Sequence, residues 1–493
     1  MTTSPKLSTR LVSAVPFAGL GSVLTLVASS LAGIAVARNA GPSGYAIFVA
    51  ANMIVFVGSV LCSLGLPLAL AKHVAVEEEV GRHESLRNAN TTVLILLSVI
   101  ALLVGLAVSY NVPALERHLN ITFGFGFALA FPLILLCAVT SDCIQGIYYG
   151  LLRPRTVIWI TVSGPVMALV YVLARRSGMN LPIWGAVAAL YLTSGLTAIC
   201  LLGWDRLLGR PARLRELSDV FKDLVPAATF TFFTVFSSWS DRWIVGAELG
   251  AVAMGSYAAA VVVVQTALRI PTHIAYLLVP ASSRISLGGK EKSKKLNSIT
   301  LSMFGAFAAL TTVILLLAAE SIMKFLFGPA FAQAGPVLSM MSLCLLASAI
   351  SIPFISVLTG SKRNRFVTYL LGLTIVPRIL LLVFLTRRWS LEGTAVALVI
   401  SESLLAVCCL LLASGMRMEF HLRPLIRPYL AGLLAYGVGL LAILGGLPKP
   451  AAAAIAVVVL LLALGRFIRA TYKETFHPDS AIAPAHLWTL LND

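Results

Sequence analysis

The stretch Val261–Pro280 reads VVVVQTALRIPTHIAYLLVP and indicates what kind of chain this is. It has the length of about 20 mainly apolar residues that a helix needs to cross a membrane. Gln265, Arg269 and His273 are nevertheless spaced by four, so a helix places them on one polar stripe. Pro271 removes a backbone hydrogen bond and favours a kink beside that stripe. Because an ionisable group at this depth normally faces a cavity or a partner, we predict a membrane span with one functional face.

The composition of the whole chain is that of an integral membrane protein. Of its 493 residues, 59% are hydrophobic and only 12% are charged, whereas soluble domains are about half apolar and a quarter charged. The net charge of +17 would suggest nucleic acid as a partner of a soluble protein, but in a membrane protein it sets the orientation of the loops, and we expect no nucleic acid. The cysteines lie in apolar runs without a CxxC pair and are interpreted as core residues, not as disulfides or metal ligands. They are Cys62, Cys137, Cys143, Cys200, Cys344, Cys408 and Cys409.

Fourteen apolar stretches are long enough to span a bilayer. With the N-terminus inside, 26 of the 37 lysines and arginines fall in inside segments, nine fall outside, and Arg269 and Arg378 lie within spans. This asymmetry predicts a multi-pass protein of the cell (plasma or inner) membrane with both termini in the cytoplasm. The spans lie near residues 11–37, 44–71, 90–110, 121–150, 156–174, 182–203, 221–246, 252–281, 296–319, 333–359, 366–386, 391–414, 428–446 and 450–468.

The first six spans recur as spans seven to twelve. YGLLRPR at 149–155 lines up with TGSKRNR at 359–365. ARNAGPSGYAIF at 37–48 echoes GAELGAVAMGSYAAA at 246–260. An even number of spans per unit predicts a parallel repeat about an axis along the membrane normal. The predicted parts are a six-helix lobe at 1–203, a basic cytoplasmic linker at 204–220, a second six-helix lobe at 221–414, two additional spans at 415–470 and a polar cytoplasmic tail at 471–493.

Two cations lie inside predicted spans. Arg378, in the run VPRILLLVF, repeats the proline-adjacent setting of Arg269. A charge at mid-membrane costs about 2.5–3.5 kcal/mol on insertion scales and is functional by default. We therefore predict a central chamber matched to an anionic substrate. The residues predicted to line it are Arg269, Arg378, Gln265 and His273.

The acids within the spans are scarcer, and Asp142 and Glu402 are the clear ones. They provide the alternative to the chamber, which is a structural ion pair of Arg378 with Glu402 or of Arg269 with Asp142. Either acid is also a candidate for proton coupling, or for a neutral carboxyl held by hydrogen bonds.

The sequence offers no enzyme chemistry. No GxxxxGK[ST] phosphate loop is present, and neither HExxH nor GxSxG occurs. Only His273 among the seven histidines falls mid-span. We therefore expect a protein that is not an enzyme and that binds no metal or cofactor.

Three runs resemble a known family. The run ARNAGPSGYAIFVAANMIVFVGSVLCSLGLPLALAKHVA at 37–75 resembles the opening of polysaccharide-export (Wzx-type) flippases of the multidrug/oligosaccharidyl-lipid/polysaccharide (MOP) exporter superfamily. SDRWIVGAELG at 240–250 resembles the segment that opens their second half, and we expect its Asp241 and Arg242 to pair locally. LTRRWSLEGTAVALVISESLLA at 385–406 resembles a later helix start without its usual proline. The residues of the first run that match the family pattern are Arg38, Gly41, Pro42, Gly44, Tyr45, Leu64, Gly65 and Pro67.

The resemblance covers the chain from residue 10 to near residue 415 and fits the fourteen-helix members. It implies two six-helix lobes around a central cavity that work by alternating access, with two extra helices at the C-terminal end. It also implies that the substrate is an undecaprenyl-pyrophosphate-linked oligosaccharide, moved from the cytoplasmic to the outer leaflet. Cavity arginines of such proteins contact the pyrophosphate, a role carried here to Arg269 and Arg378.

Three other functions compete with this prediction. A lipid II flippase would use the same chemistry. A cation-coupled multidrug exporter of the same superfamily would need a carboxylate in the early helices, and the first span has none. A non-transporting scaffold would act through a polymerase or glycosyltransferase, which are also candidate partners of a flippase. Membrane lipids are expected partners of the basic linker, and we expect a monomer.

Overall fold

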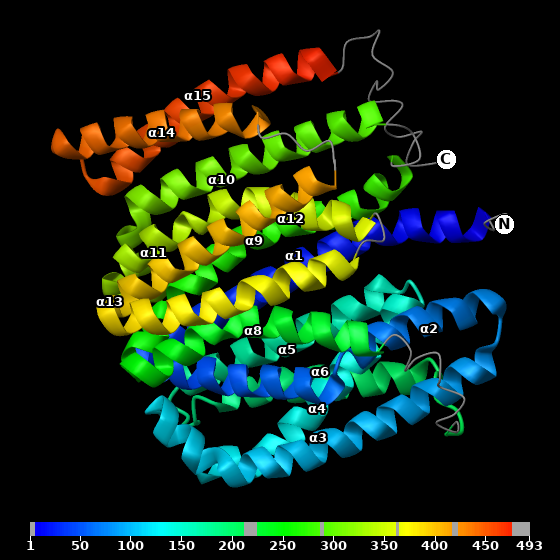
Figure 1. Cartoon of the computed structure of the whole chain (residues 1–493). Coiled ribbons are helices and arrows are strands. Elements are labelled where there is room, and N and C mark those ends of the chain that lie inside the picture. Colours follow the sequence, from blue (N-terminus) through cyan, green and yellow to red (C-terminus); the bar gives the residue numbers. More distant parts are fainter. Residues whose placement is uncertain (1–4, 212–223, 286–289, 361–363, 417–422, 476–493) are drawn as a thin grey trace. The chain divides into compact units, whose positions relative to one another are not determined.

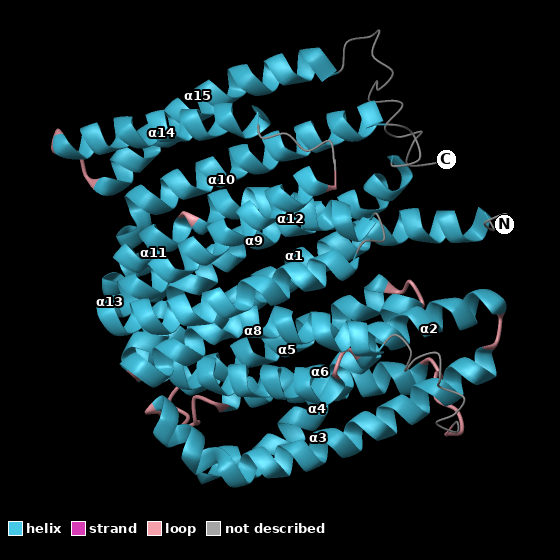
Figure 2. Ribbon diagram, viewed as in Figure 1, coloured by secondary structure: helices cyan, strands magenta, loops and turns pink. Residues whose placement is uncertain are grey.

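The computed structural model describes residues 5–211, 224–285, 290–360, 364–416 and 423–475, and within them the chain forms helices and no strand (Figures 1 and 2). The predicted all-helical class is confirmed. The chain divides into two compact units, Met1–Ala258 and Ala259–Asp493. The helices of the described segments are α1 (Pro5–Ser63), α2 (Leu66–Val80), α3 (His83–Leu119), α4 (Phe125–Gly150), α5 (Pro154–Arg176), α6 (Gly185–Trp204), α8 (Leu224–Leu249), α9 (Ala251–Ile285), α10 (Lys290–Phe327), the 3₁₀ helix η2 (Pro329–Ala334), α11 (Gly335–Ser342), α12 (Cys344–Gly360), α13 (Asn364–Gly415), α14 (Arg423–Leu444) and α15 (Lys449–Thr475).

The helices account for the predicted membrane spans. In the described ranges, nine helices are long and apolar enough to cross a membrane, or ten if the bent pair Pro329–Ser342 and Cys344–Leu358 is one span. Two of the nine, α1 and α13, contain a break and each supply two predicted spans. α8 and α15 coincide with the predicted spans near 221–246 and 450–468. The chain is therefore a multi-pass membrane protein, and each of the fourteen predicted spans overlaps a described helix.

The first break lies in the motif AGPSGY. Gly41 has φ 67° and ψ −176°, a conformation that is open almost only to glycine. A β-carbon added to Gly33 would lie 3.6 Å from the Tyr45 hydroxyl. In one straight helix, Gly33 and Tyr45 would be separated by about 18 Å along the axis. The chain therefore reverses at Gly41 between them. Tyr45 is buried at this reversal.

The motif LGLP interrupts the chain a second time and starts α2. Leu64 and Gly65 both have positive φ, 44° and 78°, and Pro67 lies in the first turn of α2, where a missing N–H is tolerated. The glycines of α4 pack against this turn. A β-carbon on Gly146 would lie 2.5 Å from the Pro67 carbonyl oxygen, and Gly150, four residues later, also meets the backbone of α2. Such small-xxx-small spacing lets two membrane helices approach closely.

α8 and the start of α9 belong to the first compact unit. A β-carbon on Gly255 would collide with the Pro42 carbonyl, so the two echoing segments at 37–48 and 246–260 pack directly on each other. Their tyrosines, Tyr45 and Tyr257, are both fully buried. The first compact unit ends at Ala258, whereas the first lobe was predicted to end at residue 203. The division of the chain into the two predicted lobes stays a prediction.

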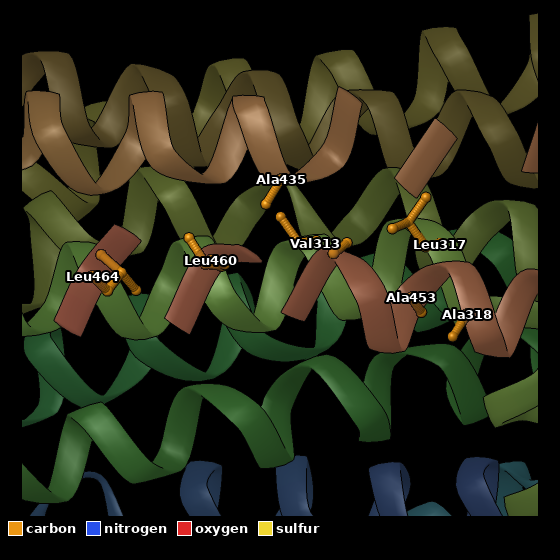
Figure 3. Close-up of a cluster of buried hydrophobic side chains, with 8 residues drawn as sticks. Val313, Leu317, Ala318, Ala435, Ala453, Leu460 and Leu464 are labelled. Atoms are coloured by element: carbon orange, nitrogen blue, oxygen red, sulfur yellow. The ribbon is translucent and has the colours of Figure 1, made fainter. Parts of the chain in front are cut away.

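In the second unit, α14 and α15 pack along α10 (Figure 1). Small residues bring these helices together, because a β-carbon on Gly432 would lie 3.1 Å from Ala309 and one on Gly439 would lie 3.1 Å from Ala456. Figure 3 shows the resulting cluster of buried side chains. Its members are Val313, Leu317, Ala318, Ala435, Ala453, Ala456, Leu460 and Leu464.

The second break folds α13 back on itself. Trp389 and Ser390 leave helical geometry, and Ser390 has φ 53° and ψ −136°. The hydroxyl oxygens of Thr386 and Thr394, on either side of the break, lie 2.8 Å apart and are buried. The two halves of α13 thus form an antiparallel pair, as the predicted spans near 366–386 and 391–414 require.

Candidate transport site

Arg378 and Glu402 form an ion pair across the two halves of α13. Their Nη1 and Oε1 atoms lie 2.8 Å apart, and the side chains are 12% and 23% exposed. The residues are 24 apart in sequence, which in one continuous helix would separate them by about 36 Å, so the reversal at Ser390 brings them together. Of the two interpretations of Arg378, the structure therefore has the ion pair with Glu402.

Arg269 has different surroundings. It lies near the middle of α9 and is exposed, while Gln265, one turn earlier, is half-buried. Among the described residues, no hydrogen bond or ion pair engages the Arg269 guanidinium. The side chain of His273 lies outside the described residues, so its place on the stripe stays a prediction. The alternative partner Asp142 belongs to the first unit, and this pairing stays a prediction too.

The opposite face of α9 packs into the second unit at the proline. Leu268 and Pro271 border a small hollow, which α10 and α12 complete with residues such as Phe304 and Ser348. Pro271 is buried there and leaves the carbonyl of Ala267 without its usual helical partner. One face of α9 is therefore apolar and packed, while Arg269 projects from another.

Asp142, in α4 of the first unit, is held by a neutral group. The Ser59 hydroxyl donates a hydrogen bond of 2.7 Å to its Oδ2 atom. In the part of the first unit that the structure describes, no cation forms an ion pair with Asp142. Of the predictions made for this acid, a carboxyl held by a hydrogen bond fits its surroundings, and proton coupling stays a prediction.

A polar and aromatic cluster near Asp142 was not found from the sequence. The Tyr191 hydroxyl of α6 donates to Asn52 Oδ1 at 3.0 Å, and Tyr191 lies close enough to Asp142 to interact with its charge. Phe56 contacts Trp239 of α8, with 5.5 Å between the ring centroids. Asn52, Phe56 and Ser59 are spaced by four and three residues, so a helix places them on one face. The two polar residues among them could have indicated that this face of α1 is not purely apolar.

Asp241 and Arg242 form a buried cluster, and the predicted local pair is confirmed. Arg242 Nη1 lies 3.3 Å from Asp241 Oδ1, and each side chain is only 5% exposed. The Tyr257 hydroxyl donates to the other carboxylate oxygen at 2.8 Å, and the guanidinium carbon lies 4.6 Å from the centre of the Trp239 ring. Both charges are thus compensated inside the first unit, which indicates a structural role.

The remaining motif residues surround the reversal of α1. Gly44 is buried, and a β-carbon there would lie 2.8 Å from the Ile183 side chain. Arg38 is exposed one turn before Gly41. Gly41 and Gly44 shape the turn and its packing, and the assignment of the whole set as a structural motif stays a prediction.

Comparison with known proteins places the chain in a family. Residues 17–286 match the family described as "Polysaccharide biosynthesis protein", and because this match covers more than half of the chain, the protein belongs to that family. Among curated protein sequences, none is similar enough to match.

Solved structures with the same fold are transporters of the MOP superfamily. An inward-facing multidrug resistance MATE family transporter aligns with a TM-score of 0.70 at 14% identity, covering 80% of this chain and 94% of its own. The lipid II flippase MurJ, in an inward closed conformation, aligns with a TM-score of 0.71 at 14% identity, covering 92% and 98%. A MOP superfamily transporter from Pyrococcus furiosus aligns with a TM-score of 0.56 at 14% identity, covering 84% and 98%. These likenesses establish the fold, which is the one expected of a Wzx-type family member.

Proposed function

We propose that this protein is a flippase that moves an undecaprenyl-pyrophosphate-linked oligosaccharide from the cytoplasmic to the outer leaflet by alternating access, for the synthesis of a cell-surface polysaccharide. The observation that carries the proposal is Arg269, an exposed cation near the middle of a membrane-spanning helix, with no ion pair among the described residues. Membership of the polysaccharide biosynthesis family supports the same substrate class.

The chemistry of Arg269 suits a pyrophosphate. A guanidinium offers several N–H donors in a planar fork that matches phosphate oxygens, and such charge-assisted hydrogen bonds are about twice as strong as neutral ones. The lipid tail can stay in the bilayer while the charged headgroup crosses. An inside-negative potential favours outward movement of an anion by about 2.3 kcal/mol per charge per 100 mV.

Arg378 can contribute a second cation only when Glu402 releases it. The ion pair of 2.8 Å occupies one Nη atom of the guanidinium. Phosphate oxygens could replace the carboxylate, or protonation of Glu402 could free the arginine, which would couple transport to protons.

Deletion of the gene tests the proposal. Lipid-linked glycans should accumulate on the cytoplasmic face of the membrane, and surface polysaccharide should be lost. Complementation with the wild-type gene should restore both, and complementation with R269A should not. A deletion strain with normal surface polysaccharide and no accumulated glycan would contradict the proposal.

The competing functions predict different results. A lipid II flippase predicts a deletion that is lethal unless a second flippase is present. A multidrug exporter predicts a drug-sensitive deletion strain with normal polysaccharide. A scaffold for a polymerase or glycosyltransferase predicts that the purified protein, reconstituted alone in vesicles, moves no lipid-linked glycan.

A further inference from the structure

One surface of the first unit gathers hydrogen-bonding side chains at membrane depth, of which only Asp142 is an acid. Asn52, Asp142, Gln145 and Tyr191 come from α1, α4 and α6, and all are half-buried. Polar groups facing lipid are costly, so this surface faces water or a polar ligand. Serines provide buried support, because Ser59 bonds to Asp142 and Ser141 accepts a hydrogen bond of 3.1 Å from Gln145.

Hydrogen bonds within the first unit hold these side chains and leave some of their donor and acceptor atoms unused. Tyr191 donates to the Asn52 carbonyl oxygen, which leaves the two N–H donors of the Asn52 amide. Ser59 occupies Oδ2 of Asp142 and leaves Oδ1, while Gln145 uses its amide nitrogen and leaves its carbonyl oxygen. Within the described residues these three remaining groups have no partner. The surface therefore offers hydrogen-bond donors on Asn52 and acceptors on Asp142 and Gln145.

Two aromatic rings adjoin these groups. Phe56 follows Asn52 by one turn of α1, and its ring contacts that of Trp239. Both rings are half-buried, and the Arg242 guanidinium lies over one face of the Trp239 ring. A ligand that fits carries many hydroxyl groups, each both donor and acceptor, and also apolar C–H faces. A sugar has this combination, whereas an inorganic cation would be matched by several acids and this surface has one.

We propose that Asn52, Asp142, Gln145 and Tyr191, with Phe56 and Trp239, bind the oligosaccharide portion of the substrate. This inference rests on the proposed function and assigns recognition of the uncharged glycan to the first unit. Sugar specificity then resides in the first unit.

Titration calorimetry on the purified full-length protein in lipid nanodiscs tests this. One probe is the repeat-unit oligosaccharide released by mild acid from the host's surface polysaccharide, without lipid or phosphate. The other probe is inorganic pyrophosphate. Tyr191→Phe and Asn52→Leu should each weaken oligosaccharide binding by about fivefold or more, the effect of a lost hydrogen bond, and leave pyrophosphate binding unchanged. Tyr171→Phe is the matched control, since it removes a hydroxyl bonded to the Pro182 carbonyl at 2.8 Å elsewhere in the same unit.

The two probes separate the two proposals. If the wild-type protein binds no oligosaccharide, or binds it equally well in Y191F and N52L, the inference is wrong. If these variants lose oligosaccharide affinity while R269A leaves pyrophosphate binding unchanged, the glycan surface stands and the role of Arg269 is wrong. Thermal unfolding of each variant, measured beside Y171F, shows whether a loss of binding reflects a loss of fold.

Discussion

Arg269 and Arg378 resemble each other in sequence and differ in structure. Both lie near the middle of apolar runs in the second unit and within two residues of a proline. Arg378 meets Glu402 at 2.8 Å because α13 reverses between them, whereas Arg269 is exposed on α9 and pairs with none of the described residues. A mid-membrane arginine is therefore not by itself a binding site, and the fold decides whether its charge is already compensated.

This difference gives the two arginines different expected roles. Two opposite charges in contact offset the cost of placing either charge in the membrane. Arg378 and Glu402 together can therefore stabilise the packing of the two halves of α13. Arg269 has no such partner among the residues that the structure describes, and binding an anion would offset the cost of its charge. Substitutions at ion-paired side chains and at Arg269 should therefore have different effects on stability and export.

The largest effect on export is expected for Arg269→Ala. Loss of charge-assisted hydrogen bonds worth about 1.5–3 kcal/mol each should reduce substrate affinity by roughly 10–100-fold, and surface polysaccharide should fall to a trace. Quantifying surface polysaccharide at matched expression measures this. Arg388→Ala, which removes an exposed cation of α13, is the control and should export normally. Normal export by R269A would assign Arg269 to a structural role.

Asp241→Asn extends the comparison to a fully buried pair. Both side chains are 5% exposed, and removing one partner of a buried pair costs about 3–5 kcal/mol. We expect a strongly lowered Tm of the purified protein in detergent. Glu320→Gln is the control, because Glu320 bridges Lys324 and Lys449 at an exposed site and its loss should leave the Tm nearly unchanged. Equal Tm values for D241N and E320Q would show that burial does not determine how much stability is lost when one partner of an ion pair is removed.

Glu402→Gln is expected to have an intermediate effect on stability. It leaves Arg378, 12% exposed, without its carboxylate, which should cost about 1–3 kcal/mol. The double variant R378L/E402L replaces the pair by apolar side chains and should recover most of the lost stability, as buried pairs usually do. Thermal unfolding of both variants measures this. A double variant less stable than E402Q would mean that Arg378 has a second essential role.

The smallest effect on export is expected for Asp142→Asn. Asp142 is bonded to the Ser59 hydroxyl, whereas Glu402 is paired with a cation. Asparagine can still accept the Ser59 hydrogen bond, but it is a weaker acceptor for a sugar hydroxyl. Export should fall by about fivefold, with its dependence on pH unchanged. Export measured between mildly acidic and mildly basic pH tests this. A complete loss of export, or a flattened pH profile, would instead assign Asp142 to proton coupling.

The sequence predicted the helices and their breaks because these depend on local chemistry. Apolar length located the spans, and Gly41 and Gly65 marked positions whose backbone favours glycine. The pair of Asp241 with Arg242 was predictable because the two are neighbours in sequence.

Contacts between distant residues were not predictable from local patterns. Tyr191 and Asn52 are 139 residues apart, and only the packing of α6 against α1 brings them together. The sequence offered the pair of Arg378 with Glu402 as one of two alternatives, and the choice between them depended on a side-chain contact that only the folded structure shows. The packing of α8 with the first unit likewise follows from tertiary contacts, since the repeat assigns this helix to the second half.

The most direct test of the account is translocation by the purified protein in vesicles. A fluorescent undecaprenyl-pyrophosphate-linked oligosaccharide would be placed in both leaflets, and its transfer measured for the wild type, R269A and the control R388A. We predict transfer by the wild type and R388A and a rate at least about tenfold lower for R269A, the loss of one charge-assisted contact. An R269A protein that moves this lipid at the wild-type rate would contradict the claim that an uncompensated arginine at membrane depth binds the pyrophosphate.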